Sequence, residues 1–255
     1  MLLLWQTVAL AQQPFLTDDA DVTEHRKLHF EFSNEFDFLN PSASPNLRQN
    51  TSSFELNYGI FKNVEIGIEC PLITIFNEKG TMPQTPFGIG DTNFSIKYNF
   101  LKEQEGKRHP AMSLSFNLEI PTGDVSKQLG SGVEDFFLNY ILQKSLSETL
   151  TLRANSGVIL SGNTLTGVIG INTRGLVLTG GSSLVKEITP KLQLGGEVFG
   201  AVARNANLGK GQLQLQFGGN YFLRDNLSLD FGLIVGGNFP SSPRVGLQLG
   251  FSVDF

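Results

Sequence analysis

The sequence predicts an all-β fold, an antiparallel up-and-down transmembrane β-barrel of about twelve strands. Three observations predict it: apolar residues at every second position, connections that alternate between short and long, and four tyrosines at matching places before the short connections. Composition agrees with strands, because only 17% of the 255 residues are charged and the 28 glycines suit tight turns better than helices.

The N-terminus has the pattern of an export signal. Residues 1–11 combine an apolar run with Ala9-Leu10-Ala11, an A-x-A cleavage site, although the positively charged start of such a signal is missing. We expect a truncated signal peptide at 1–11, an N-terminal periplasmic segment at 12–26 and the barrel at 27–255. A buried N-terminal helix is the alternative. No later apolar stretch approaches the ~18 residues that a spanning helix needs.

Period-two alternation marks the strands. In residues 28–38, for example, leucine and phenylalanine alternate with His, Glu, Ser and Asp. Most of these segments are about nine to twelve residues long, the length of a tilted strand that crosses a membrane. The predicted strands are residues 28–38, 54–60, 64–76, 94–100, 112–120, 136–142, 150–160, 176–184, 192–200, 213–221, 227–235 and 245–255.

The connections between these segments are of two kinds that alternate. The shorter kind comprises residues 61–63, 145–149, 185–190 and 223–226, with the charged stretch 102–109 as its longest member. The longer kind is rich in Pro, Gly, Ser and Asn and comprises residues 40–50, 77–90, 121–132 and 238–244. Short turns at one end and long loops at the other predict a meander with both termini at the short-turn end.

The tyrosines indicate a membrane interface. Each of the four lies on the apolar face a few residues before a short turn, and the C-terminal residue falls at the same end. An amphipathic ring at one depth suits the headgroup boundary, where the hydroxyl stays hydrated. The predicted girdle consists of Tyr58, Tyr98, Tyr140, Tyr221 and Phe255.

The polar positions between the apolar ones are predicted to line the lumen. The candidate lining residues are His29, Glu31, Glu35, Glu55, Glu65, Glu69, Lys97, Glu119, Arg153, Glu197, Asp230 and Arg244, with Asp37, Asp135 and Lys191 on the same face. One interpretation is an acidic passage that favours cations or neutral polar solutes. The other is a plugged interior of paired charges, because a charge facing lipid would cost about 2 to 4 kcal/mol.

Enzymatic signals are weak. An outer-membrane hydrolase would need a serine and a histidine on the outer rim, but His25 precedes the first strand, His29 faces inward and His109 lies in a charged turn. No G-x-S-x-G occurs, and residues 88–93 (GIGDTN) lack the third glycine of a dinucleotide loop. We expect no catalytic residue and no cofactor. The net charge of −5 argues against a nucleic-acid partner.

Metal binding is also disfavoured. Residues 17–25 (TDDADVTEH) offer several carboxylates, but their spacing does not fit a calcium loop and no glycine makes the turn, so a solvated segment is expected. The single cysteine, Cys70, excludes an internal disulfide and a Cys-rich metal site. Cys70 shares the outward parity of its neighbours and is expected to act as a small apolar residue.

Several stretches resemble known proteins. The last strand, VGLQLGFSVDF (245–255), resembles the assembly signal of bacterial outer-membrane barrels, which implies outer-membrane lipid and the barrel-assembly machinery as partners. Four stretches are similar to outer-membrane transporters of the phenol-degradation (MetA-pathway) family: PFLTDD (14–19), GIGDTNFSIKYNF (88–100), EIPTGD (119–124) and GSGVEDFFLNYILQKSLSETLTLRANSG (130–157).

The resemblance implies a channel in the bacterial outer membrane for the passive passage of small molecules, aromatic or hydrophobic compounds among them. It brings no catalytic residues. Two alternatives stay open at this point. One is a non-conducting barrel with a structural or adhesive role, and the more distant one is a soluble lipid carrier, which would place its apolar residues inside.

Overall fold

The computed structural model describes residues 14–41, 46–78, 84–104, 108–161, 175–203, 212–237 and 242–255. The signal peptide expected at residues 1–11 lies outside these ranges. No helix in the described part of the chain is long and apolar enough to cross a membrane.

The alternating segments fold into long strands. Among the described residues, Val125–Lys127 forms a short 3-10 helix. Branched and aromatic side chains at every second position suit a pleated surface that is buried on one side only. The strands are β1 (Leu28–Phe38), β2 (Asn46–Phe61), β3 (Val64–Asn77), β4 (Phe87–Ile89), β5 (Thr92–Leu101), β6 (Ala111–Ile120), β7 (Asp135–Ser147), β8 (Leu150–Ser161), β9 (Gly175–Thr189), β10 (Leu192–Ala203), β11 (Gln212–Arg224), β12 (Leu227–Val235) and β13 (Val245–Asp254).

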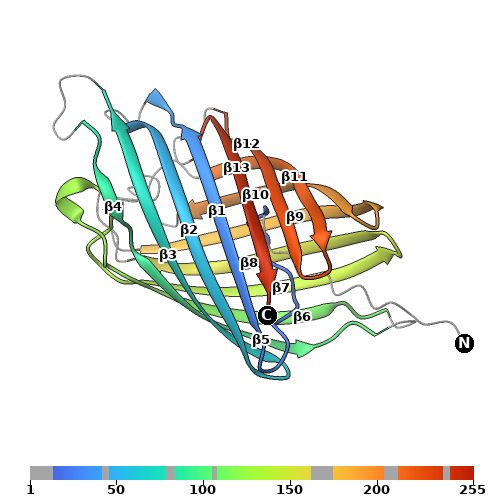
Figure 1. Cartoon of the computed structure of the whole chain (residues 1–255). Coiled ribbons are helices and arrows are strands. Elements are labelled where there is room, and N and C mark those ends of the chain that lie inside the picture. The colour runs from blue at the N-terminus through green and yellow to red at the C-terminus, as the bar shows by residue number, and fades with distance from the viewer. Residues whose placement is uncertain are drawn as a thin grey trace, which may run out of the picture.

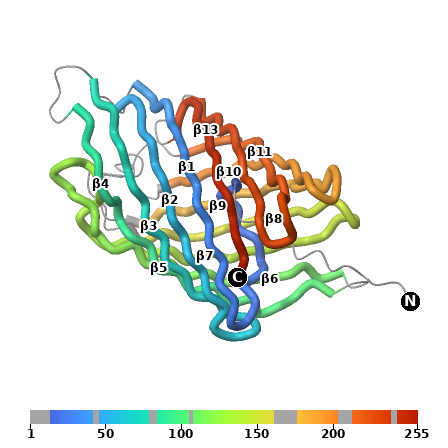
Figure 2. The backbone as a smooth tube through the Cα atoms, viewed as in Figure 1, coloured from blue at the N-terminus to red at the C-terminus, as the bar shows by residue number. Residues whose placement is uncertain are grey.

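The strands close into a barrel (Figures 1 and 2). Each long strand pairs antiparallel with its neighbours in the chain, and β1 pairs with both β2 and β13 to close the sheet. Closure satisfies the backbone hydrogen bonds that an open edge would leave exposed. The twelve-stranded antiparallel barrel predicted from the sequence is confirmed, with β4 as a short additional strand.

β4 and β5 together form one neighbour of β3. β3 pairs with β5 over Val64–Glu69 and with β4 over Leu72–Thr74, and the break between the two strands falls at Gly90–Asp91. The sequence analysis assigned Phe87–Ile89 to a loop. Three residues are too few to show alternation, so this strand is defined by its pairing alone.

The two ends of the barrel differ as expected. Turns of two residues join β2 to β3, β7 to β8, β9 to β10 and β11 to β12, whereas the connections at the other end are longer. Leu28 and Phe255 exchange backbone hydrogen bonds of 3.3 and 2.9 Å, so β1 begins where β13 ends, at the short-turn end. The predicted common end for the two terminal strands is confirmed.

Several strands extend beyond their predicted bounds. β2 begins at Asn46, in a stretch predicted to be a loop, and β9 continues to Thr189 through a predicted turn. Residues 46–53 are mostly polar on both faces and show no alternation, yet they pair residue by residue with β1 and β3. Hydrogen bonding to existing neighbours therefore defines these strand ends.

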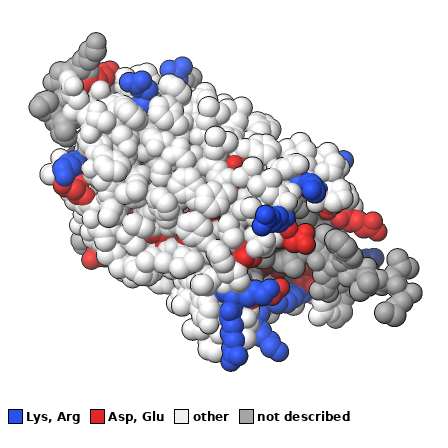
Figure 3. Space-filling view, viewed as in Figure 1, with Lys and Arg blue, Asp and Glu red and all other residues white. Residues whose placement is uncertain are grey.

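The outer wall is apolar. On β13, Val245, Leu247 and Leu249 are exposed while Gly246 and Gln248 between them are buried. The face shown in Figure 3 is largely uncharged between its two ends, where most of the Lys, Arg, Asp and Glu side chains gather. This is the distribution expected of a barrel surrounded by lipid.

Candidate functional site

The inner wall carries most of the residues predicted to line the lumen. His29, Glu31, Glu65, Lys97, Arg153, Glu197 and Asp230 are buried, and Glu35, Glu55, Glu69 and Glu119 are half-buried at positions of inward parity. Arg244 is an exception. It precedes β13 and is exposed, so its place in the lumen wall stays a prediction.

The predicted girdle residues lie on the outer wall near the short-turn end. Tyr58, Tyr98, Tyr140 and Tyr221 are each about two-fifths exposed, and Phe255 is 68% exposed. Tyr98 and Tyr140 both pair with Leu114, so these two lie on one line across three strands. Their role at a membrane interface remains a prediction.

A segment of the N-terminus lies inside the barrel. We call residues 14–25 the lumen segment. Thr17, Asp19, Ala20 and Thr23 are buried, with at most 5% of their surface exposed. The expectation of a solvated segment here is wrong, because the inner wall supplies partners for its backbone and its carboxylates.

Lys97 on β5 lies at the centre of the contacts with the lumen segment. Its Nζ lies 3.1 Å from Asp18, 3.7 Å from Asp19 and 3.2 Å from Glu65. Arg153 on β8 approaches Asp19 at 3.7 Å from the other side. Lys97 and Arg153 are the only buried Lys and Arg among the described residues, and both contact the lumen segment.

Backbone groups of the lumen segment bond to side chains of distant strands. On β10, Glu197 accepts hydrogen bonds from the amides of Leu16 (3.1 Å) and Thr17 (2.5 Å). On β3, Glu65 accepts one from the amide of Thr23 (2.6 Å) and another from its hydroxyl (2.9 Å). The segment therefore spans the interior between opposite parts of the wall.

Further contacts tie the segment to the remaining wall. Thr17 Oγ1 donates to Ser183 on β9 at 2.6 Å. Asn99 on β5 donates to the carbonyl of Ala20 at 2.6 Å, and Gln143 on β7 donates to Asp21 at 2.9 Å. These contacts satisfy polar groups that would otherwise be buried at a cost.

Inward-facing glycines make room for the segment. A Cβ at Gly59 would collide with the carbonyls of Thr23 and Glu24, one at Gly195 with the ring of Phe15, and one at Gly218 with Pro14. These glycines lie on three different strands. The space that the lumen segment occupies is thus provided by glycines of several strands and does not depend on one contact.

One carboxyl group of the lumen segment has a shifted pKa. Burial raises the pKa of Asp18 to about 6, and the neighbouring carboxylates of Asp19 and Glu65 add to this rise, while Lys97 opposes it. The Asp18 carboxyl therefore titrates above its ordinary range, in a place where one lysine serves three acids.

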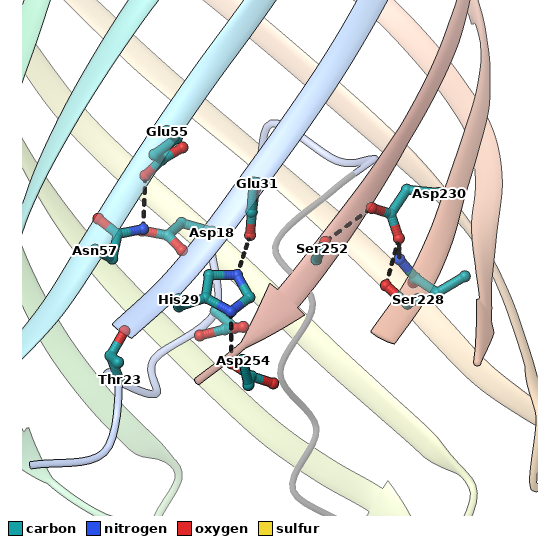
Figure 4. Close-up of polar contacts among 12 residues, drawn as sticks. Asp18, Thr23, His29, Glu31, Glu55, Asn57, Ser228, Asp230, Ser252 and Asp254 are labelled. Carbon is teal, nitrogen blue, oxygen red and sulfur yellow. Dashed lines mark hydrogen bonds and ion pairs between the residues drawn. The ribbon is translucent and has the colours of Figure 1, made fainter. Parts of the chain in front are cut away.

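A second polar cluster lies at the seam where the barrel closes. His29 on β1 contacts Asp254 on β13 through Nδ1 and Glu31 through Nε2, each at 2.7 Å (Figure 4). Both ring nitrogens bond to carboxylates, which suits a structural role in joining β1 to β13. Asp230 on β12 accepts from Asn220, Ser228 and Ser252, so the polar inner face continues along this seam.

The loop between β6 and β7 folds against the barrel at the break between β4 and β5. The Asp91 carboxylate accepts hydrogen bonds from the amides of Gly123 (2.9 Å) and Ser131 (2.5 Å). Leu129 of this loop is buried with Ile73 and Ile75. An apolar cluster therefore lies near the long-loop end of the otherwise polar inner wall.

The sequence analysis missed both the lumen segment and the role of Asp91. An acidic segment outside the alternating pattern gives no signal for docking, and its partners come from strands far apart in the chain. The inward-facing glycines were the available signal, since they mark a close backbone approach. In the described residues no group of His, Cys, Asp and Glu has the arrangement of a metal site.

Comparison with known proteins identifies a matching family. The family described as "Putative MetA-pathway of phenol degradation" matches residues 48–255. No curated protein matches the sequence significantly.

Solved structures share the fold. An outer-membrane channel from Pseudomonas putida F1 has a TM-score of 0.70 and 12% identity over 93% of this chain and 98% of that chain. The NanC porin has a TM-score of 0.60 and 8% identity over 89% and 98% of the two chains. The KdgM porin, solved with disordered oligogalacturonate, has a TM-score of 0.55 and 9% identity over 89% and 99%.

Proposed function

We propose that this chain, which belongs to the phenol-degradation (MetA-pathway) family, is a passive channel of the bacterial outer membrane for small molecules. The barrel-assembly machinery would insert it, with the short turns and the girdle at the periplasmic side. It acts by diffusion through the barrel and performs no chemistry on the solute.

One observation carries the proposal. The barrel has an apolar outer wall and a mostly polar inner wall, and four of the inward carboxylates, Glu35, Glu55, Glu69 and Glu119, remain partly exposed. A barrel that only needed to fill its interior could do so with apolar side chains, as small soluble sheets do. Partly exposed charges support water in the lumen.

The family name supports small aromatic compounds as solutes. The acidic inner wall adds a constraint, because carboxylates repel anions at short range in a narrow lumen. Neutral phenols and cations are therefore favoured over aromatic carboxylates.

A non-conducting barrel with a structural role is the second candidate, and the lumen segment favours it. Residues 14–25 contact the wall from β2 to β12 and fill part of the interior. If the segment blocks the whole cross-section, the charges of the wall serve only to hold it.

Single-channel recording in a planar bilayer tests the proposal. The purified barrel should produce discrete conductance steps, and these steps should grow when the segment is weakened by Asp18→Asn with Asp19→Asn. Asp225→Asn, an exposed turn residue, is the control and should leave the steps unchanged. A folded barrel that never conducts, with or without these substitutions, would transfer the assignment to the structural alternative.

A further inference from the structure

The register of the strands brings five carboxylates into one line on the inner wall. Glu31 on β1 pairs directly with Glu55 on β2, and Glu55 pairs with Glu69 on β3. Glu69 pairs with Asn93 on β5, Asn93 with Glu119 on β6, and Glu119 with Asp135 on β7. We call Glu31, Glu55, Glu69, Glu119 and Asp135 the carboxylate ladder.

The ladder climbs the wall. Neighbouring strands lie about 4.8 Å apart, and a line perpendicular to tilted strands rises as a spiral. Glu31 lies near the short-turn end of β1, whereas Asp135 is the first residue of β7, at the long-loop end. The ladder therefore connects the two ends of the barrel over about half of its wall.

This arrangement opposes folding. Like charges directly across from one another destabilise a sheet, and the ladder contains three such pairs, Glu31 with Glu55, Glu55 with Glu69, and Glu119 with Asp135. In the described part of the chain no Lys or Arg forms an ion pair with the three middle members. The buried cations that could have done so, Lys97 and Arg153, contact the lumen segment instead.

Glu31 supplies a second, independent observation. Its side chain is 2% exposed, and His29 occupies Oε1. The second oxygen, Oε2, is buried without a hydrogen-bond partner among the described residues. A buried carboxylate oxygen with no donor is costly, and a cation or a protonated amine on the lumen side would remove that cost.

We propose that the carboxylate ladder is a binding track for organic cations, and that linear polyamines are the class it fits best. Directly paired positions on adjacent strands lie about 5 Å apart. The ammonium groups of a linear polyamine are separated by short methylene chains of similar reach, so successive ammonium groups meet Glu31, Glu55 and Glu69 in turn. Asn93 lies between Glu69 and the last two carboxylates. Several weak sites in a row permit entry and release, as conduction requires. Passage along the ladder rests on the proposed channel function, whereas binding to it does not.

Calorimetric titration of the folded barrel in detergent with spermidine tests the proposal without a bilayer. Wild type should bind spermidine, and Glu55→Gln with Glu69→Gln and Glu119→Gln should weaken binding by about tenfold or more. The control carries the same change in charge at exposed turns and loops, Glu134→Gln with Glu148→Gln and Asp225→Asn, and should bind like wild type.

Three results would decide the matter. Failure of wild type to bind, or equal weakening in the control, would overturn the ladder as a track. A barrel that conducts but does not bind spermidine would leave the channel function standing and remove the ladder. A barrel that binds spermidine through the ladder but does not conduct would support the ladder and remove the channel. Should the triple variant not fold, Glu69→Gln alone must weaken binding for the proposal to hold.

Discussion

Glu65 and Glu69 lie four residues apart on the same face of β3, in opposite surroundings. Glu65 faces the lumen segment, where Lys97 and two groups of Thr23 satisfy its carboxylate. Glu69 belongs to the carboxylate ladder, where Glu55 is its direct neighbour on β2. Among the described residues it has no cation partner and accepts hydrogen bonds only from neutral side chains, Ser53 and, at a long 3.5 Å, Asn93. The inner wall thus contains two regions. In one, charged side chains bind the lumen segment, and in the other, carboxylates face one another across neighbouring strands.

The difference shows that burial of charge has two uses in this barrel. In the region of the lumen segment, hydrogen-bond donors and cations of the protein satisfy the acids, so these contacts stabilise the folded protein. In the ladder, carboxylates are direct neighbours, and under our proposal a cation from outside relieves their repulsion. Four experiments can break or sharpen this comparison. The first three are ordered by their expected effect on the free energy of unfolding, and the fourth follows a titration.

The largest effect is expected for Lys97→Met. This change leaves Asp19 and Glu65 buried, and Asp18 half-buried, without their shared cation, and removal of one partner of a buried charge network costs about 3 to 5 kcal/mol. Urea unfolding followed by circular dichroism would show the loss in the free energy of unfolding. A loss below about 1 kcal/mol would mean that water reaches these acids and that the lumen segment is loosely held.

His29→Ala should cost less, because it affects only the seam between β1 and β13. Without the imidazole, the carboxylates of Glu31 and Asp254 lose their common donor, at an expected cost of about 1 to 3 kcal/mol. The same unfolding measurement applies, with His109→Ala in the connection between β5 and β6 as the control. Equal effects of the two changes would show that the seam does not depend on this contact.

Glu69→Gln should have the opposite sign. Removing one charge from a direct pair of like charges relieves repulsion, which predicts a gain of about 0.2 to 1 kcal/mol in the free energy of unfolding. Glu65→Gln, four positions earlier on the same face, should instead destabilise the protein. If both substitutions destabilise to a similar extent, the two regions do not differ and the comparison fails.

The fourth experiment follows the titration of Asp18. Folding raises the pKa of Asp18 from 3.8 to about 6, so the folded state holds this proton more tightly than the unfolded state. Its contribution to stability is therefore fully present below about pH 4 and is lost as the pH rises through about 6. Carboxyl-carbon NMR should place the Asp18 midpoint near 6, and an ordinary midpoint near 3.8 would show that this side chain is hydrated.

The barrel could be predicted from the sequence, whereas the docking of the lumen segment could not, for physical reasons. Outward Leu247 and inward Gln248 follow from period two, which is a local property of the chain. The docking of Thr17 against Ser183 and Glu197 depends on strands that are distant in sequence, and nothing local in residues 17–25 specifies them. The ladder is an intermediate case, because each Glu was predicted to face inward while its direct neighbours depend on the register between strands.

The most direct test of the account is the reversal potential across a potassium chloride gradient, measured on single channels of wild type and of Glu69→Gln with Glu119→Gln. The partly exposed carboxylates of the ladder predict a cation-selective wild type, less selective at high salt because screening grows, and reduced selectivity in the double variant. Glu134→Gln with Glu148→Gln should behave like wild type. An anion-selective wild type, or a double variant as cation-selective as wild type, would contradict the account.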